Sequence, residues 1–398
     1  LDPRDRAQAR RIIATVLHRR GEVDARIDEC LDRPLASRHT RVRNILRVGT
    51  AELIFLETPA HAAVDAAVRQ AGRYRRGAFK GLVNAVLRRI GREPENREGT
   101  DTPGEINTPG WMLDRWREIY GADVAREIAA AHLIEPPLDL TLSRHADPQE
   151  WAAKLDAKIL PGGTLRRRTG GRVDEFPGFD EGVWWIQDVA ASLPAKLLRN
   201  DADTRVIDLC AAPGGKTMQL ADRGPNVTAV DISHGRLAAL HENLARTGLS
   251  ADIVDADASQ WRPDQPADAV LLDAPCAATG TVRRHPDIPW RRREADIANA
   301  TKLQDRLLAA AVNMVGPGGT IVYSVCSLEP EEGTARIDAL LASGAPVTLD
   351  PISAVDWPEL DGLEPAAITP AGTLRTLPCH WSERGGMDGF FAARLIRN

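Results

Sequence analysis

The sequence predicts an all-helical amino-terminal domain followed by an α/β domain built on a doubly wound parallel sheet, with a small α/β subdomain between them. Three observations lead to this fold class. The first ninety residues repeat their apolar positions with helical spacing, short apolar runs alternate with helical patterns from Val183 onward, and a glycine turn lies within that alternation at position 214. The length of 398 residues accommodates two or three domains, each with its own core.

Composition indicates an ordinary globular protein, with 43% apolar and 27% charged residues. No apolar run reaches the roughly 18 residues of a membrane helix, and the charged amino terminus lacks a signal-peptide core, so we expect a cytoplasmic protein without membrane contact. We also expect a monomer. The cysteines are odd in number and too widely spaced for a zinc pattern, so we expect reduced thiols and no metal at Cys30, Cys210, Cys276, Cys326 and Cys379.

Charge is distributed unevenly along the chain, although the net charge is only −5. Residues 1–90 carry 19 basic and 10 acidic side chains, a net charge of +9, whereas the rest carries 32 basic and 46 acidic side chains, a net charge of −14. Because phosphate binding requires local positive charge, this asymmetry favours a basic docking domain joined to an acidic catalytic one. The alternative is a solvated basic surface with no partner.

The predicted helical domain covers residues 1–92. The segment from Gly72 to Gly77 predicts a basic turn with three arginines, and a helix from Phe79 to Ile90 follows it. The apolar positions with i, i+3, i+4 spacing in this domain are Ile12, Ile13, Val16, Leu17, Val42, Ile45, Leu46, Val48, Leu82, Val83, Val86 and Leu87.

Three further segments follow this domain. Residues 93–109 are polar and rich in Pro and Gly, which predicts a linker. We expect a small α/β subdomain over residues 110–180 and the main α/β domain over residues 181–398. The strands expected in the main sheet are Arg205 to Leu209, Val227 to Asp231, Asp252 to Asp255, Ala269 to Leu272 and Thr320 to Val325, with the clearest helices at Gly235 to Thr247 and Asp296 to Met314.

The decapeptide from Asp208 to Thr217 predicts a strand, a glycine turn and the start of a helix, a geometry that brings backbone N–H groups close to a ligand. Cys210 stands where a Walker A loop requires glycine, and the G-x-G-x-x-G dinucleotide pattern is absent. The turn resembles that of methyltransferases that bind S-adenosylmethionine, in the Ala-Pro-Gly-Gly-Lys form of the RNA cytosine-5 methyltransferases.

S-adenosylmethionine is recognised by carboxylates at strand ends, because it carries ribose hydroxyls, an adenine edge and a sulfonium cation. Asp231 ends the second strand 17 residues after Gly214, where an acidic residue meets ribose hydroxyls in Rossmann-like sheets. Asp257 follows the third strand and is a candidate acceptor for the adenine amino group. Taken alone, either carboxylate is more typical of a solvated loop. The expected cofactor contacts are Cys210, Ala211, Ala212, Pro213, Gly214, Gly215, Lys216, Asp231, Arg236, Asp257 and Asp273.

Two cysteines at strand ends indicate covalent catalysis. The fourth strand ends in Asp273-Ala-Pro-Cys276, and a later strand ends in Tyr323-Ser-Val-Cys326. Carbon 5 of a pyrimidine is a poor nucleophile, so its methylation needs attack of a thiolate on carbon 6. A carboxyl group such as Asp273 near N3 stabilises the charge that develops in the ring. These residues alone do not decide which cysteine attacks.

The chain as a whole resembles the RsmB/Sun/Fmu family of 16S ribosomal RNA cytosine-C5 methyltransferases, with a Rossmann-like class I methyltransferase domain. Its first domain is similar to NusB-like RNA-binding domains, chiefly over residues 43–53 and 79–90. The resemblance assigns the attack to Cys326 and the release of the methylated base to Cys276. Segments 187–192 and 386–394 also resemble the family, and the loop 283–290, continued by arginines 291–293, resembles a basic loop that would hold RNA phosphates while Trp290 packs or stacks.

Three positions depart from the family pattern: Ala277 replaces Ser, Val325 replaces Thr and Gly333 replaces Asn. We expect the first two to change hydrogen bonding near the pocket without removing a reacting group.

The resemblance implies methyl transfer from S-adenosylmethionine to C5 of a cytosine in small-subunit ribosomal RNA. Transfer RNA is the alternative acceptor. A noncatalytic RNA-binding or antitermination factor with a vestigial methyltransferase fold is a different kind of alternative, and the presence of Cys276, Cys326 and Asp273 together speaks against it.

Overall fold

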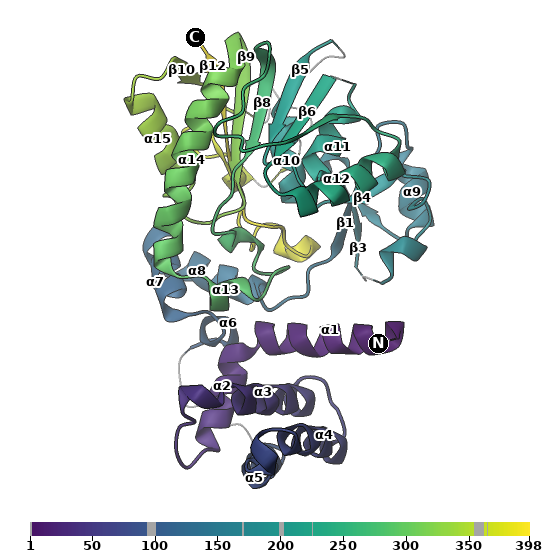
Figure 1. Ribbon diagram of the computed structural model, residues 1–398, viewed down its shortest axis with the longest axis vertical. Coiled ribbons are helices and arrows are strands. Elements are labelled where there is room, and N and C mark those ends of the chain that lie inside the picture. Colours follow the sequence, from purple (N-terminus) through teal and green to yellow (C-terminus); the bar gives the residue numbers. More distant parts are fainter. Residues whose placement is uncertain are drawn as a thin grey trace. The chain divides into compact units, whose positions relative to one another are not determined.

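Figure 1 presents the protein as a computed structural model, which describes residues 2–93, 101–168, 171–198, 203–224, 226–353, 362–363 and 365–398. Contacts divide the chain into two compact units. The helical unit comprises residues 1–134 and 285–291, and the sheet unit comprises residues 135–284 and 292–398. No helix in the described ranges is long and apolar enough to cross a membrane.

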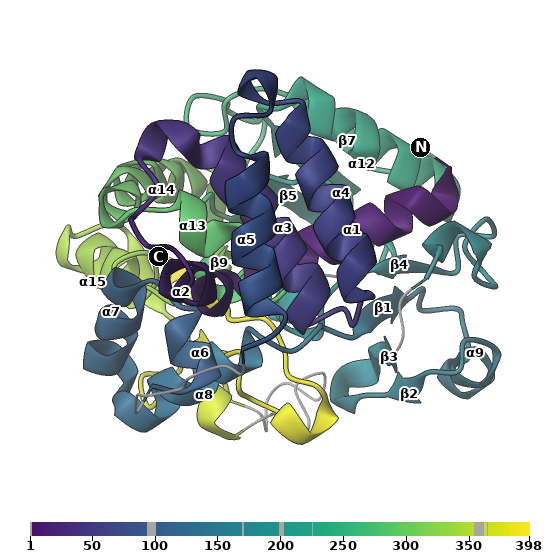
Figure 2. The same ribbon diagram turned by 90° about the horizontal axis from the view of Figure 1, so that it is seen from below.

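The helical unit is built around α3, α4 and α5, which lie side by side in Figures 1 and 2. Its core contains the apolar residues that the helical spacing predicts, among them Val42, Leu46, Val83 and Leu87. The helices of this unit are α1 (Pro3–His18), α2 (Arg20–Glu29), α3 (Thr40–Ile54), α4 (Ala60–Gly72), α5 (Lys80–Ile90), α6 (Pro103–Ile106), α7 (Gly110–Tyr120), α8 (Ala122–Ala131) and α13 (Ile288–Arg291).

The predicted linker over residues 93–109 differs from the structure in its second half, while its residues 94–100 lie outside the described ranges. Thr102 and Glu105 form a reciprocal capping box that starts α6. Asn107 is buried and donates to the Glu22 carboxylate at 2.6 Å, so this segment packs into the helical unit. Helices α7 and α8 also belong to that unit, although the sequence assigned them to the following subdomain.

A four-stranded antiparallel sheet forms the small α/β subdomain, in the order β2-β3-β1-β4. Its core contains Leu140, Leu155, Leu165 and Trp184. The elements are β1 (Leu138–Leu142), α9 (Pro148–Lys154), β2 (Lys158–Ile159), β3 (Leu165–Arg167) and β4 (Trp184–Ile186).

The main sheet has the strand order β10-β12-β9-β8-β5-β6-β7, with β11 paired to β12. All five predicted strands are present and run parallel, but β12 pairs antiparallel with β9, so the sheet is mixed rather than wholly parallel. The strands are β5 (Arg205–Leu209), β6 (Asn226–Asp231), β7 (Asp252–Asp255), β8 (Ala267–Asp273), β9 (Val315–Val325), β10 (Val347–Leu349), β11 (Leu374–Arg375) and β12 (Phe391–Arg397).

Helices cover both faces of this sheet (Figure 1). Alternate strand residues face opposite layers: Val206 and Leu271 pack with α10 and α11, whereas Ile207 and Leu272 pack with α14. The chain leaves β5 toward β6 on one side and returns to β8 on the other, which places a topological switch point at the carboxyl ends of β5 and β8. The helices are α10 (Val189–Lys196), α11 (Gly215–Ala221), α12 (His234–Thr247), α14 (Glu294–Met314) and α15 (Thr334–Ala342).

Candidate active site

The glycine turn connects β5 to α11 at the switch point. Cys210 and Gly214 both have positive φ, +62° and +106°, so the backbone reverses sharply between strand and helix. A Cβ atom on Gly214 would lie 2.2 Å from Leu240 Cδ1, which explains why only glycine fits there. The first-turn N–H groups of α11 have no partner within the helix, so the turn has the donors that the sequence predicts.

Asp208 anchors this turn from inside the sheet. Its side chain is fully buried, and one carboxylate oxygen accepts a hydrogen bond from Thr217 Oγ1 at 2.6 Å. The other oxygen, Oδ1, is buried without a hydrogen-bond partner. Burial raises the pKa of Asp208 to about 7, so the protonated form of this carboxyl group is favoured below that pH. The sequence contains Asp208 in the motif but does not indicate this protonation behaviour.

Asp231 lies beside the turn, as the spacing predicts. Its carboxylate accepts from Ala212 N at 3.0 Å and from Ser233 N at 2.8 Å, and Arg236 lies 3.7 Å from it. Arg236 also donates to the Ala212 carbonyl, so the end of β6 and the glycine turn are fastened together. Next to this carboxylate, Ile232 has 69% of its surface exposed, which is unusual for a large apolar residue.

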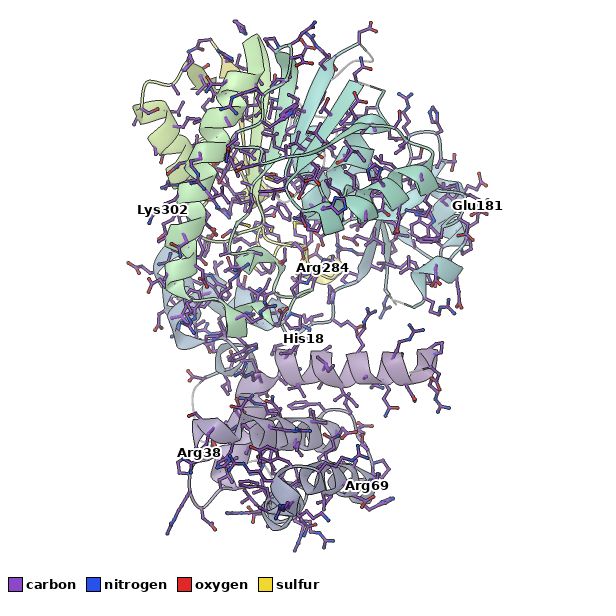
Figure 3. All side chains as sticks on the ribbon, in the orientation of Figure 1. His18, Arg38, Arg69, Glu181, Arg284 and Lys302 are labelled. Carbon is purple, nitrogen blue, oxygen red and sulfur yellow. The ribbon has the colours of Figure 1, made fainter. Side chains whose placement is uncertain are left out.

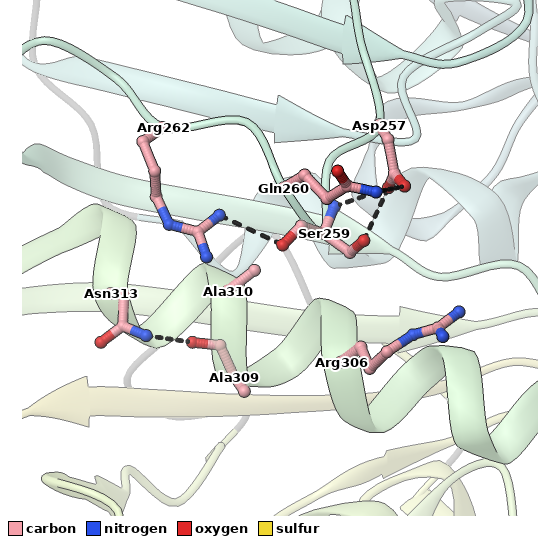
Figure 4. Close-up of a pocket in the computed structure, with 8 residues that line it drawn as sticks. All are labelled: Asp257, Ser259, Gln260, Arg262, Arg306, Ala309, Ala310 and Asn313. Carbon is pink, nitrogen blue, oxygen red and sulfur yellow. Dashed lines mark hydrogen bonds between the residues drawn. The ribbon is translucent and has the colours of Figure 1, made fainter.

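Asp257 follows β7 and is held by its own loop (Figure 4). Oδ1 accepts from both the N–H and the hydroxyl of Ser259, at 2.9 and 2.8 Å, and Oδ2 accepts from Gln260 Nε2 at 2.9 Å. The Ser259 hydrogen bonds lower the pKa of Asp257, so its carboxylate stays charged. A pocket of about 400 Å³ lies between this loop and α14, lined by Asp257, Ser259, Gln260, Arg262, Arg306, Ala309, Ala310 and Asn313.

Lys216 and Asp273 form an ion pair across the switch point, with Nζ 2.7 Å from Oδ2. Burial alone would lower the pKa of Lys216, but the Asp273 carboxylate raises it above its ordinary value. Ser324, the register partner of Asp273 on β9, donates to its other oxygen at 3.0 Å. The Lys216 ammonium also lies 5.1 Å from the centre of the Phe390 ring. Asp273 is therefore fixed in orientation by two donors from two elements.

Cys276 and Cys326 meet at neighbouring strand ends, with their sulfur atoms 3.5 Å apart. Both side chains are partly exposed. The hydrogen bond to Cys326, together with burial, raises the pKa of the Cys276 thiol well above its usual value. Either sulfur can be the donor in the hydrogen bond between them. Burial likewise raises the pKa of Cys210, which remains a thiol in the wall of the turn.

A buried carboxyl group that the sequence reasoning missed connects the two cysteine loops. Glu332 is fully buried and accepts from Ala277 N at 2.8 Å and from the Ser327 hydroxyl. Ala277 directly follows Cys276, and Ser327 directly follows Cys326. Gln304 on α14 also donates to Glu332, at 3.2 Å. Burial raises the pKa of Glu332. The sequence gives no signal for this role, because two of the three donors, Ala277 N and Gln304, come from other segments.

The departures from the family pattern have structural explanations. Val325 is fully buried in the core cluster between the sheet and α14, so its methyl groups do not face the pocket as expected. Ala277 uses its backbone N–H, not its side chain, to reach Glu332. A Cβ atom on Gly333 would lie 2.7 Å from Arg375 Nη2 and 2.9 Å from Phe391 Cγ, so a larger residue requires these side chains to move.

The first two arginines of the loop after β8 do not form the phosphate-binding surface that the sequence predicts, whereas Arg291, Arg292 and Arg293 are exposed. Arg283 is only 2% exposed, and Arg284 (Figure 3) forms ion pairs with Asp188 and Asp388. Arg292 donates to the Ala277 carbonyl at 3.2 Å, which ties this loop to the Cys276 segment. Two of the arginines are therefore internal to the sheet unit.

Trp290 packs rather than stacks on a ligand. Its Nε1 donates to the Leu17 carbonyl at 3.0 Å, and the Arg20 guanidinium lies 4.5 Å from the centre of its ring. Both partners belong to the same helical unit as Trp290.

No group of three or more His, Cys, Asp and Glu side chains placed to hold a metal ion occurs within the described ranges.

Comparison with protein families gives two matches. Residues 195–396 match the family of 16S rRNA methyltransferases RsmB/F, and residues 1–92 match the NusB family. Among curated proteins, ribosomal RNA small subunit methyltransferase B of Salmonella arizonae is 33% identical over 99% of this chain and 91% of its own length. The protein of the same name from Klebsiella pneumoniae is 35% identical over 99% of this chain and 90% of its own length.

Two solved structures share the fold. The crystal structure titled PH0851 aligns with a TM-score of 0.80 at 24% identity, covering 97% of this chain and 89% of that one. The structure of NSun6 from Pyrococcus horikoshii with SFG aligns with a TM-score of 0.61 at 19% identity, covering 73% of this chain and 98% of that one.

Proposed function

Because the chain belongs to the RsmB/F family of 16S rRNA methyltransferases, which use S-adenosylmethionine, we propose that it methylates C5 of a cytosine in small-subunit ribosomal RNA through a cysteine adduct. The observation that carries this proposal is the pair of sulfur atoms 3.5 Å apart at the ends of β8 and β9. Methylation of an exocyclic amine needs no thiol, whereas methylation of carbon 5 needs a nucleophile at carbon 6.

The residues at the switch point fit S-adenosylmethionine. Gly214 keeps the turn free of a side chain, and among the described residues each oxygen of the Asp231 carboxylate accepts one hydrogen bond, which leaves lone pairs for ribose hydroxyls. The exposed Ile232 beside it suits the face of an adenine ring. When bound, S-adenosylmethionine supplies a methyl group on a cationic sulfonium. We assign its contacts to residues 210–216, Asp231, Ile232, Arg236, Asp257 and Asp273.

Cys326 is the nucleophile in this proposal. As its thiolate, it forms a bond to carbon 6 of the cytosine, which moves the electron pair of the C5–C6 double bond onto carbon 5. That electron pair takes the methyl group, and the sulfonium leaves as a neutral thioether. The Cys276 S–H, 3.5 Å from Cys326, stabilises negative charge on the attacking sulfur before the bond forms.

Asp273 holds the pyrimidine ring. Its carboxyl group is fixed by Lys216 and Ser324, so it is oriented before the base arrives. Placed at the N3 edge of the cytosine, it stabilises the charge that develops in the ring.

Cys276 completes the reaction after methyl transfer. The proton on carbon 5 is removed, its bonding electrons re-form the C5–C6 double bond, and the bond between carbon 6 and Cys326 breaks. We assign this proton removal to Cys276, directly or through water, after Cys276 has released its own S–H proton to solvent. The Cys276 thiolate takes up the C5 proton and becomes a thiol again, and Cys326 leaves carbon 6 as a thiolate. The reaction then returns both sulfur atoms to their starting states.

The proposal is tested with labelled methyl donor and two acceptors, 16S ribosomal RNA and transfer RNA. We expect label in the ribosomal RNA, and nuclease digestion should recover it as 5-methylcytidine. Label in transfer RNA alone would assign the chain to the alternative substrate. Label recovered on an exocyclic nitrogen would contradict the covalent mechanism.

A further inference from the structure

The turn between α4 and α5 has an unusual backbone. Arg75, Arg76 and Gly77 have φ values of +44°, +55° and +81°, three consecutive residues in the left-handed region. Only glycine adopts this region without strain, so two arginines here are held against their conformational preference. Strain of this kind concentrates at functional sites. The side chains of Arg75 and Arg76 are exposed, so the turn holds them at the surface and does not pack them into the core.

Aromatic rings hold the guanidinium groups around this turn. Arg41 and Arg75 lie 5.6 and 5.7 Å from the centre of the Tyr74 ring. Tyr74 in turn lies 5.9 Å from Phe79, which packs at 4.8 Å against His39. The cations therefore share one aromatic base that links α3 to the turn, and their side chains lose less conformational freedom when they bind an anion.

Two more cations extend the same surface. The Lys80 side chain lies against the start of the turn. A Cβ atom on Gly72 would be only 2.6 Å from Lys80 Cε. Arg38 precedes His39 in the chain, and burial together with the charges of Arg38 and Arg75 lowers the pKa of His39. We call the exposed cations of the turn and of its aromatic neighbours the Arg75 patch, and they are Arg38, Arg41, Arg73, Arg75, Arg76 and Lys80.

The Arg75 patch lacks counter-charges, unlike a neighbouring group of arginines. Arg20, Arg43 and Arg47 all form ion pairs with Asp24, and Arg43 also pairs with Asp28. Among the described residues, none of the six patch cations has a carboxylate within 4.0 Å. The helical unit thus neutralises one arginine cluster internally and leaves the other for an external anion.

We propose that the Arg75 patch binds the phosphate backbone of the substrate RNA. Six exposed, uncompensated cations on and around one turn match a series of phosphates, and RNA is the polyanion that the proposed function supplies, on which this inference rests. Tyr74 is covered by guanidinium groups, so the patch contacts backbone rather than stacking on bases. Binding here positions RNA without reading its sequence.

The test replaces both strained arginines by glycine, Arg75→Gly with Arg76→Gly, in the full chain. These changes remove two charges and also relieve the backbone strain, so we expect the melting temperature to stay equal or rise. Binding of a 16S ribosomal RNA fragment should weaken roughly ten-fold at 0.15 M salt, with the log–log salt slope about 1.5 shallower, because two phosphate contacts are lost. A second pair, Arg38→Gln with Lys80→Gln, should weaken binding in the same direction.

The charge-matched control is Arg69→Ala with Arg126→Ala. Both arginines are exposed and lie outside the patch: Arg69 is paired with Asp65, and Arg126 with Asp123 and, at 3.9 Å, with Glu105, which keeps its closer partner Arg117 in the control. Figure 3 places Arg69 on the other side of the helical unit from Arg38. The control should keep the wild-type salt slope. An unchanged slope in the glycine pair would overturn the inference, and so would loss of binding to anionic phospholipid vesicles with RNA affinity intact.

Binding and methyl transfer are measured separately, so the two proposals fail separately. If the wild type methylates ribosomal RNA but the glycine pair binds it normally, the patch assignment is wrong and the proposed function stands. If the glycine pair loses RNA affinity but the wild type transfers no methyl group, the patch assignment stands and the proposed function is wrong.

Discussion

The sulfur atoms of Cys276 and Cys326 lie 3.5 Å apart, although 50 positions separate the residues in the chain. Adjacent parallel strands bring them together, because β8 and β9 end at the same edge of the sheet. The hydrogen bond to Cys326 and burial raise the pKa of the Cys276 thiol. The proposed mechanism gives each cysteine a different role, and single substitutions can separate the two roles.

We predict opposite phenotypes for the two cysteine variants. Cys326→Ala should abolish methyl transfer, because no sulfur remains to attack carbon 6. Cys276→Ala should still attack but fail to release, and should accumulate a protein–RNA adduct that survives denaturing gel electrophoresis. Cys379→Ala, a thiol outside this pair, should keep full activity. Full turnover by Cys326→Ala would show the assignment to be wrong.

Ile232→Ala should weaken binding of S-adenosylmethionine. The side chain is 69% exposed, so its truncation leaves no cavity, and the loss comes from apolar area that the adenine ring would cover. Partial burial of an isoleucine contributes about 1 kcal/mol, which corresponds to a roughly five-fold higher Kd by calorimetry. Ile13→Ala, at an exposed isoleucine of α1, provides the same substitution in the other unit. Equal affinities in the two variants would remove Ile232 from the cofactor site.

Glu332→Ala should lower kcat without changing the KM for RNA. The substitution leaves Ala277 N, the Ser327 hydroxyl and Gln304 without their acceptor, so both cysteine loops lose their common support. We expect a loss of about 100-fold in kcat and a destabilisation of about 2 kcal/mol.

Glu332→Gln is the matched control for that prediction. Its amide oxygen accepts from Ala277 N and its amide N–H reaches the Ser327 hydroxyl, which can accept as well as donate. We expect this variant to recover most of the activity and to react with a thiol reagent at Cys326 over the same pH range as the wild type. A Glu332→Ala protein with wild-type kcat would refute the positioning role.

Asp208 should make folding stability fall as pH rises. Its pKa is raised from 3.8 to about 7 in the folded chain, so between these values the folded state binds the proton that the unfolded state has released. The stability present below pH 3.8 is therefore lost as pH rises through 7, by at most about 4 kcal/mol.

Urea unfolding at pH 5 and pH 8 checks this behaviour. Asp208→Asn cannot ionise, so its stability relative to the wild type should increase from pH 5 to pH 8. Asp338→Asn, at an exposed position of α15, should leave the difference between the two pH values unchanged. A pH-independent difference between Asp208→Asn and the wild type would mean that the carboxyl group titrates normally.

Five strands of the main sheet, β5 to β9, were predictable from short runs bounded by turn residues, and the two cysteines were placed at strand ends on the same basis. The strands β10 and β11 were not predicted, and neither was the antiparallel direction of β12 beside β9, because strand direction depends on connections that local pattern does not contain. Ile232 and Glu332 were not predicted as site residues, for a related reason. The exposure of Ile232, and the hydrogen bonds that Ala277 N and Gln304 donate to Glu332, become visible only when distant segments are folded together.

Two segments were predicted wrongly, each for a physical reason. Arg283 and Arg284 look like an exposed basic loop, but their partners Asp188 and Asp388 lie about a hundred residues away on either side and draw them inside. The segment after residue 100 reads as a linker from its Pro and Gly content. There the sequence did contain a signal, since Thr102 followed by Glu105 is the spacing of a capping box.

The short segment 285–291 gives the chain an unusual connectivity. It packs with the helical unit, yet both of its flanks belong to the sheet unit, so the chain passes between the units three times. Trp290 donates to Leu17, which means that a transplanted amino-terminal unit would arrive without its α13 and leave Trp290 behind without a hydrogen-bond acceptor. Recombination between relatives at the single junction near residue 134 would therefore separate Leu17 from the Trp290 with which it forms a hydrogen bond. We expect α1 and the loop that contains Trp290 to be inherited together.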